Sequence, residues 1–182
     1  MTIHGLLLAA GAGRRMGRPK ALVDDWLVRS VEVLRAGGCD RVTVVLGAEA
    51  ELAREIVPDL AGVVVADDWA EGMGASLRAG LARMSESADA DAVLVSLVDL
   101  PDVDADVVRR VLAAAVGPAS LSRATYAGRP GHPVLIGRDH WAGVRAAAVG
   151  DRGARDYLRG HPHDLVECGD LATGRDVDRP IA

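Results

Sequence analysis

The stretch LLLAAGAGRRMGRPKAL, residues 6–22, joins an apolar run to a loop that holds three glycines and four basic residues. The apolar run is continuous rather than alternating, which is typical of a strand buried on both faces of a parallel sheet. Open α/β sheets bind ligands beyond the carboxyl ends of their strands. The stretch therefore predicts an α/β fold in which this loop borders a ligand site.

The rest of the chain repeats the alternation of apolar runs and helical patterns. Strands are predicted at residues 3–9, 41–47, 62–67 and 91–99, with weaker ones at 120–126, 132–136 and 164–167. Helices are predicted at residues 25–36, 48–56, 74–84, 104–115, 138–147 and 153–159. This order favours a Rossmann-like, doubly wound, mostly parallel sheet flanked by helices. A length of 182 residues suits one domain, residues 1–182.

Composition narrows the classes of partner. The formal net charge of −5 argues against nucleic acid held on a general basic surface, because such binding neutralises phosphates. No segment approaches the roughly 18 apolar residues of a membrane span. Cys39 and Cys168 form no CxxC pair, which favours free thiols. We expect a cytoplasmic protein with no nucleic-acid or membrane partner.

The glycine loop fits neither of two familiar phosphate-binding motifs. The spacing of its glycines differs by one residue from the motif GxGxxG, and the motif GxxxxGK[ST] does not occur in the loop. The loop can still present backbone N–H groups to an anion, flanked by guanidinium and ammonium groups that pair with phosphate oxygens. A phosphate-binding loop is the prediction; a flexible loop with solvated basic side chains is the alternative.

Five motifs, in order, resemble a known family. Leu8-Ala9-Ala10-Gly11-x-Gly13-x-Arg15-Met16-Gly17-x-Pro19-Lys20 resembles the signature loop of nucleotidyltransferases that carry an NTP to a phosphorylated acceptor. DDWAEGMGASLRAGL (67–81), LVDLP (97–101), GRPGHPVLIG (128–137) and GDRGAR (150–155) point to molybdenum cofactor cytidylyltransferases and their relatives. The resemblance implies a fold like that of the nucleotide-diphospho-sugar transferases. Ala10 favours the cytidylyl group, which tends to read LAAG where the guanylyl group reads LAGG.

Candidate donor-site residues lie in the motifs that follow the strands. Asp99 ends the most hydrophobic strand, where a carboxylate could face a triphosphate through Mg²⁺, although a turn or cap aspartate is the alternative. The resemblance assigns Asp99 to the metal, and Arg15 and Lys20, with Asp99, to catalysis, the two cations neutralising the leaving pyrophosphate. The predicted nucleotide-binding residues are Leu8, Ala9, Ala10, Gly11, Ala12, Gly13, Gly72 and Ser76.

Three further residues are candidates for the metal and for the acceptor. Asp151 is a second candidate metal carboxylate, or an ordinary helix cap. His132 and Arg155 are predicted to bind the acceptor. The alternative for His132 is that it orients its loop. The alternative for Arg155 is an ion pair with a neighbouring aspartate. Gly74 stands where a serine is common in the family, and the turn after Lys20 is shorter than usual in the family. The sequence therefore identifies the family more firmly than it identifies the acceptor.

The resemblance implies a Mg²⁺-dependent enzyme that moves CMP from CTP to the phosphate of molybdopterin cofactor and releases pyrophosphate. A molybdenum hydroxylase would then receive the product. One alternative uses GTP as donor, or a sugar or polyol phosphate as acceptor. Another is a non-catalytic protein that binds nucleotide or pterin cofactor and delivers it to a partner.

Overall fold

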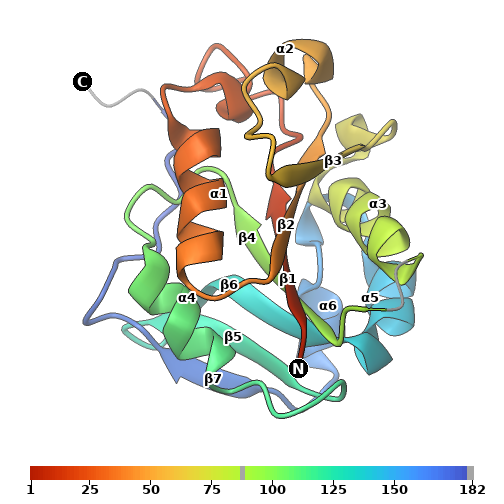
Figure 1. The fold of residues 1–182 in the computed structure, drawn as a ribbon, viewed down its shortest axis with the longest axis vertical. Coiled ribbons are helices and arrows are strands. Elements are labelled where there is room, and N and C mark those ends of the chain that lie inside the picture. Colours follow the sequence, from red (N-terminus) through yellow and green to blue (C-terminus); the bar gives the residue numbers. More distant parts are fainter. Residues whose placement is uncertain (87–88, 180–182) are drawn as a thin grey trace.

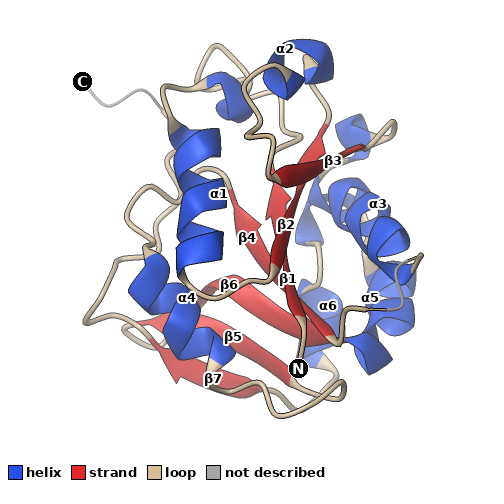
Figure 2. Ribbon diagram, in the orientation of Figure 1, coloured by secondary structure: helices blue, strands red, loops and turns tan. Residues whose placement is uncertain are grey.

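The strands form one sheet in a computed structural model that describes residues 1–86 and 89–179 (Figures 1 and 2). Its strand order is β3-β2-β1-β4-β6-β5-β7. The strands are β1 (Ile3–Leu8), β2 (Arg41–Leu46), β3 (Ala61–Val65), β4 (Ala92–Leu97), β5 (Leu121–Tyr126), β6 (Arg129–Gly137) and β7 (Asp164–Glu167). Strands β3, β2, β1 and β4 run parallel, and β7 runs parallel to β5. The predicted mostly parallel α/β sheet is thus confirmed.

Helices cover both faces of the sheet. They are α1 (Trp26–Ala36), α2 (Ala50–Arg54), α3 (Met73–Ser85), α4 (Ala105–Leu112), α5 (Trp141–Ala147) and α6 (Arg155–Arg159). Figure 1 shows α1 and α4 on one face and α3, α5 and α6 on the other. Leu6 and Leu7 are both fully buried, one in each of the two apolar clusters between sheet and helices. Burial on both faces is why the strands read as continuous apolar runs.

A tight turn reverses the chain between β5 and β6. Only Ala127 and Gly128 separate the two strands, and both have positive φ, 51° and 75°. Two residues cannot make the crossover that parallel neighbours need, so β5 and β6 form an antiparallel hairpin. Strand β6 also pairs antiparallel with β4, with Val134 opposite Val95. The start of β6 therefore lies beside the carboxyl end of β4.

Two expectations from composition can be compared with the structure. Cys39 and Cys168 are both free, as predicted, and both are buried. Among the described residues, none of the helices combines the length and the apolar character needed to cross a bilayer.

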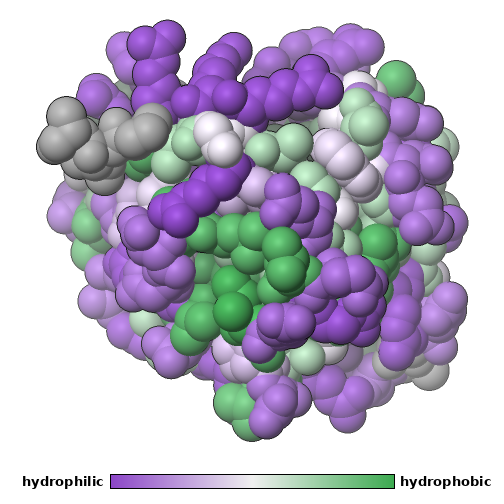
Figure 3. Space-filling view, turned by 90° about the horizontal axis from the view of Figure 1, so that it is seen from above, coloured by the Kyte–Doolittle hydropathy of each residue, from purple (hydrophilic) through white to green (hydrophobic). Residues whose placement is uncertain are grey.

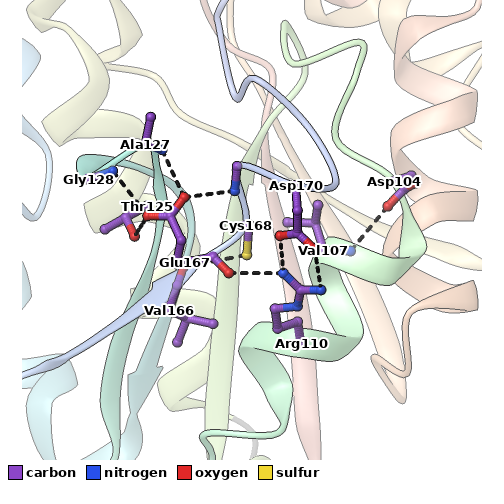
Figure 4. Close-up of polar contacts among 11 residues, drawn as sticks. Asp104, Val107, Arg110, Thr125, Ala127, Gly128, Val166, Glu167, Cys168 and Asp170 are labelled. Carbon is purple, nitrogen blue, oxygen red and sulfur yellow. Dashed lines mark hydrogen bonds and ion pairs between the residues drawn. The ribbon is translucent and has the colours of Figure 1, made fainter.

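The carboxylate of Glu167 fastens the end of β7 to the β5–β6 hairpin (Figure 4). It accepts hydrogen bonds from the N–H groups of Ala127 (2.8 Å), Gly128 (3.0 Å) and Gly169 (2.9 Å), and from the hydroxyl of Thr125 (2.8 Å). These donors, led by Gly128, lower the pKa of Glu167 to about 2. The charged carboxylate is therefore the form that the fold favours.

Replacing Glu167 by glutamine is expected to lower the melting temperature at pH 7 and to matter less as the pH falls. A depressed pKa in the folded state gives stability that is present above the unfolded pKa, near 4.5, and is lost as the pH falls toward 2. Thermal melting of both proteins between pH 7 and pH 2.5 measures the gap. Glu51→Gln, at an exposed position on α2, is the control. A gap that does not change with pH would contradict the prediction.

Beyond β7 the chain returns toward the carboxyl end of β4. Arg110 of α4 holds Asp170 with two hydrogen bonds, of 2.5 and 3.0 Å (Figure 4). Farther along, the N–H of Val177 donates to the backbone carbonyl of Asp99 at 3.0 Å. These contacts bring the last described residues next to the strand end at which the sequence predicts the donor site.

Candidate active site

A cleft of about 350 Å³ opens beyond the carboxyl ends of β1 and β4. Figure 3 looks down on this end of the molecule and shows an apolar area ringed by hydrophilic side chains. Of the residues predicted from the sequence, the cleft is lined by Leu8, Ala9, Ala10, Gly11, Gly13, Arg15, Lys20, Gly72, Ser76, Asp99 and Asp151. Ala12, His132 and Arg155 are not among its lining residues. The structure therefore places the predicted donor-site residues, except Ala12, around one cavity.

The glycine loop leaves the sheet at the edge of this cleft. The N–H of Ala9 donates to Val45 at 2.9 Å, and the carbonyl of Ala10 accepts from Ala48 at 3.0 Å, so the chain stays beside β2 up to residue 10. Gly13 has a φ of +57°, and a Cβ there would lie 1.9 Å from the backbone oxygen of Arg18. The fold of the loop thus requires glycine at position 13.

Replacing Gly13 by alanine is expected to destabilise the protein by about 1–3 kcal/mol, because the new methyl group meets backbone and the positive φ is strained. Urea denaturation measures the loss. Gly11→Ala is the matched control, since a Cβ at Gly11 would meet nothing within 4 Å. Equal stability of the two variants would show that the loop refolds around the alanine.

Lys20 and Asp99 form an ion pair inside the cleft. Lys20 begins the short 3₁₀ turn Lys20–Leu22, and its Nζ lies 2.5 Å from Oδ2 of Asp99. Asp99 is 8% exposed, and its other oxygen, Oδ1, is buried with no hydrogen-bond partner among the described residues. Burial raises the pKa of Asp99, and pairing with Lys20 only partly offsets it. Burial opposes the charge of Lys20, but hydrogen bonds to Asp178 and Asp99 outweigh it and raise the Lys20 pKa.

A third group in this cluster, Asp178, was not found by sequence reasoning. Its Oδ1 lies 2.6 Å from Nζ of Lys20, and its Oδ2 lies 3.1 Å from Nη1 of Arg15. The Lys20 hydrogen bond lowers the pKa of Asp178. One oxygen each of Asp99, Asp176 and Asp178 lie within 4.8 Å of one another. Carboxylate oxygens with this spacing, one of them on a buried side chain with an unpartnered oxygen, suit a divalent cation such as Mg²⁺ or Mn²⁺.

Asp151 reaches the cleft from a different part of the chain. It lies in the 3₁₀ turn Gly150–Arg152 beside Gly72, where a Cβ at residue 72 would come within 2.3 Å of Oδ1 of Asp151. Asp151 lines the cleft but does not belong to the group of three close carboxylates. Its metal role stays a prediction.

A basic cluster lies near the start of β6. Burial, reinforced by the positive charges of Arg123 and Arg155, lowers the pKa of His132 to about 4, so this imidazole is neutral at pH 7. Arg123 donates from Nη2 to the carbonyl of Gly131 at 3.2 Å, and its Nε is buried without a partner among the described residues. The structure thus brings His132 and Arg155 into one region and adds Arg123, which the sequence analysis missed.

Solved structures identify the fold. Rv0371c from Mycobacterium tuberculosis H37Rv is 30% identical and superimposes with a TM-score of 0.83, over 98% of this chain and 93% of that one. A complex of Rv0371c with manganese is 29% identical, with a TM-score of 0.74 over 92% and 88% of the two chains. The 2-C-methyl-D-erythritol 4-phosphate cytidylyltransferase of Thermus thermophilus, 22% identical with a TM-score of 0.65 over 97% and 93% of the two chains, shares the fold. With its cleft, this fold is that of the nucleotidyltransferases of the nucleotide-diphospho-sugar transferase type.

Sequence comparison then identifies the family. A model of the MobA-like NTP transferase domain matches residues 5–165. The chain belongs to this family and is a nucleotidyltransferase. It is 38% identical to a nicotine blue oxidoreductase of Paenarthrobacter nicotinovorans, over 97% of this chain and 92% of the relative. It is 30% identical to a molybdenum cofactor guanylyltransferase of Rhodobacter capsulatus, over 82% and 72% of the two chains.

Proposed function

We propose that this protein transfers a nucleotidyl group from a nucleoside triphosphate to the phosphate of molybdopterin cofactor and releases pyrophosphate. The observation that carries the proposal is the ion pair of half-buried Lys20 with buried Asp99 beside the glycine loop. A cation for phosphate oxygens and a carboxylate with an unpartnered oxygen face the same cleft. The Rhodobacter capsulatus relative, a molybdenum cofactor guanylyltransferase, supports the acceptor.

The proposed chemistry depends on charge and position. Arg15 and Lys20 neutralise the charge that builds on the leaving pyrophosphate, while the glycine loop holds the phosphates through its N–H groups. Asp99 would hold Mg²⁺, which when bound supplies charge neutralisation at the triphosphate. An acceptor phosphate is already ionised at neutral pH, so no general base is needed. Catalysis by positioning and electrostatics is the usual pattern of phosphoryl transfer.

We assign the acceptor to the basic cluster near the start of β6, whose residues His132 and Arg155 lie outside the lining of the cleft. His132 and Arg155 were expected there, and Arg123 adds a second guanidinium to their neighbourhood. Arginine suits recognition of a phosphate group because its fork of donors can bind two oxygens. A molybdenum hydroxylase that receives the product remains part of this proposal.

The donor base has two candidates. Ala10 lines the cleft and favours CTP through the resemblance to cytidylyltransferases. The Rhodobacter capsulatus relative and a probable molybdenum cofactor guanylyltransferase of Opitutus terrae, 33% identical over 57% of this chain, favour GTP. We therefore expect binding of CTP or GTP in preference to ATP and UTP.

The test is calorimetric titration of the four triphosphates with and without Mg²⁺, followed by an assay of pyrophosphate release with molybdopterin. Metal-dependent binding of CTP or GTP and release of pyrophosphate only with molybdopterin support the proposal. Turnover with a sugar or polyol phosphate, and not with molybdopterin, would show that the proposed acceptor is wrong. Binding without turnover on any acceptor would favour the delivery role, and the absence of nucleotide binding by folded protein would refute the donor site.

A second candidate function is reduction of a pigment-like substrate. It is favoured by one observation, the 38% identity to a nicotine blue oxidoreductase over 97% of this chain. Oxidation of NADH or NADPH in the presence of nicotine blue, followed by absorbance at 340 nm, tests it. Pyridine nucleotide consumption that depends on the dye would support the redox function, and its absence beside nucleotidyl transfer would exclude it.

A further inference from the structure

A second pocket lies at the other end of the sheet from the cleft. It has a volume of about 220 Å³ and opens at the start of β1, which the N mark indicates in Figure 1, and at the starts of β2 and β3, beside the last turn of α3. It shares none of its lining residues with the cleft. The proposed nucleotidyl transfer therefore gives this amino-end pocket no role.

The strand register brings polar side chains to one face of the sheet at the amino-end pocket. His4 of β1 lies opposite Arg41 of β2, and Leu6 lies opposite Thr43. Leu6 packs in the apolar cluster that includes residues of α3. Paired residues of neighbouring strands share a face, and so do alternate residues of one strand. His4, Arg41 and Thr43 therefore face α3, whose last turn contributes Arg83 to the pocket.

Two of these polar groups are buried without a hydrogen-bond partner. His4 is 3% exposed, and its Nε2 has no partner among the described residues. Thr43 is 9% exposed, and its hydroxyl group makes no hydrogen bond to any residue within 1–86 and 89–179. A Cβ at Gly62 would lie 3.3 Å from Oγ1 of Thr43, so the glycine keeps the space beside this hydroxyl open. Because buried polar groups are normally hydrogen-bonded, the pocket calls for a polar ligand.

Two arginines make the amino-end pocket positive. Arg41 and Arg83 line it, and no acidic side chain lines it in the part of the chain that the structure describes. Nη1 of Arg41 lies 3.1 Å from Oδ2 of Asp89, and Nη1 of Arg83 lies 3.1 Å from Oε2 of Glu86. Both arginine side chains are more than half exposed, and ion pairs at such exposure contribute little free energy. Both guanidinium groups are therefore able to turn to an anion in the pocket.

The apolar part of the lining favours an organic anion over an inorganic one. Leu60, Val63 and Met84 contribute to the lining, and Leu60 is 67% exposed. A carbon chain placed on these side chains would remove apolar surface from water, which is favourable. The volume of the pocket is below the roughly 300–1,000 Å³ of sites for drug-sized ligands, so the anion must be small.

We propose that the amino-end pocket binds a small organic carboxylate. The guanidinium groups of Arg41 and Arg83 and the hydroxyl group of Thr43 bind the carboxylate oxygens. The carbon chain covers Leu60. A guanidinium group suits this anion because it can form two parallel hydrogen bonds with a carboxylate. Binding here does not require nucleotidyl transfer, so it is tested independently of the proposed function.

Titration with sodium butyrate at constant ionic strength tests the proposal, with the histidine ring signals followed by NMR. Burial lowers the pKa of His4, so its ring stays neutral at pH 7.5, and the variant His4→Gln identifies its signal. We expect a saturable shift of the His4 signal with butyrate and none with butanamide, which has the same chain without the charge. The absence of a saturable shift, or an equal shift with butanamide, would overturn the proposal. Saturation by inorganic phosphate at a lower concentration than by butyrate would overturn the assignment to a carboxylate.

Two variants locate the binding of butyrate. Arg83→Met is expected to weaken it about tenfold, the effect of losing a hydrogen bond between charged groups. The matched control, Arg35→Met, changes an exposed arginine in the last turn of α1, outside this pocket, and should leave the affinity unchanged. Thr43→Val removes a hydroxyl group that has no partner in the fold. It is expected to weaken binding about threefold without lowering the melting temperature. Unchanged butyrate affinity in both Arg83→Met and Thr43→Val would overturn the proposal.

Discussion

Replacing Lys20 by methionine is expected to lower the rate of nucleotidyl transfer by about 10²–10³-fold, the effect of removing one donor that stabilises developing charge. Methionine keeps much of the length of the side chain and removes its charge. The loss should appear mainly in kcat, because the charge on the pyrophosphate grows as the bond to the α-phosphorus breaks. Release of pyrophosphate under saturating triphosphate measures the effect.

A matched control lies two residues away. Arg18 belongs to the same loop, but its side chain is 52% exposed and pairs with Asp24 rather than with the cleft. Arg18→Met should therefore leave kcat within twofold of the unmodified protein. A comparable loss in both variants would mean that the general positive charge of the loop matters, and that Lys20 has no particular role.

Replacing Asp99 by asparagine is expected to have the largest effect, about a 10³-fold fall in Mg²⁺-dependent turnover, because metal stabilisation of charge is worth several kcal/mol. The fold should not lose stability. Burial disfavours the charge of Asp99 and raises its pKa, and Lys20 keeps its other partner, Asp178, at 2.6 Å. Because Lys20 stays paired with Asp178, the substitution avoids the cost of leaving a charge without a partner.

Two measurements separate these effects of Asp99→Asn. Thermal melting at pH 7.5 should show an equal or higher midpoint than that of the unmodified protein, while calorimetry should show triphosphate binding that no longer depends on Mg²⁺. Asp106→Asn, which changes an exposed acid on α4, serves as control and should bind with unaltered metal dependence. Full metal dependence in Asp99→Asn would remove this residue from the donor site.

Much of the fold could be predicted because its strands are buried on both faces. Consecutive residues such as Leu6 and Leu7 are both apolar although they face opposite sides of the sheet. The positions of β1, β2 and β4 are therefore clear from apolar runs alone. The direction of β6 was not specified. It depends on the length of one turn, Ala127–Gly128, which allows only an antiparallel return.

The candidate site was predictable where chemistry follows a strand directly. Lys20 and Asp99 both follow apolar runs, and parallel strands deliver them to the same edge of the sheet. Asp178 was not predicted as a site residue because its segment has no apolar periodicity and its contacts span 158 residues or more. Arg123 was not predicted as a site residue because a charged residue in a weakly apolar strand is usually part of a solvated face. Its buried Nε shows otherwise.

The anchors at Glu167 and Asp170 have a consequence for biosynthesis. During translation the glycine loop leaves the ribosome before β7, which completes the sheet of the described residues, and Asp178 follows only after β7. A nascent chain that already has its whole sheet would still carry Lys20 and Arg15 without Asp178, the acidic partner that they share. The charge balance of the cleft is therefore completed only after the sheet.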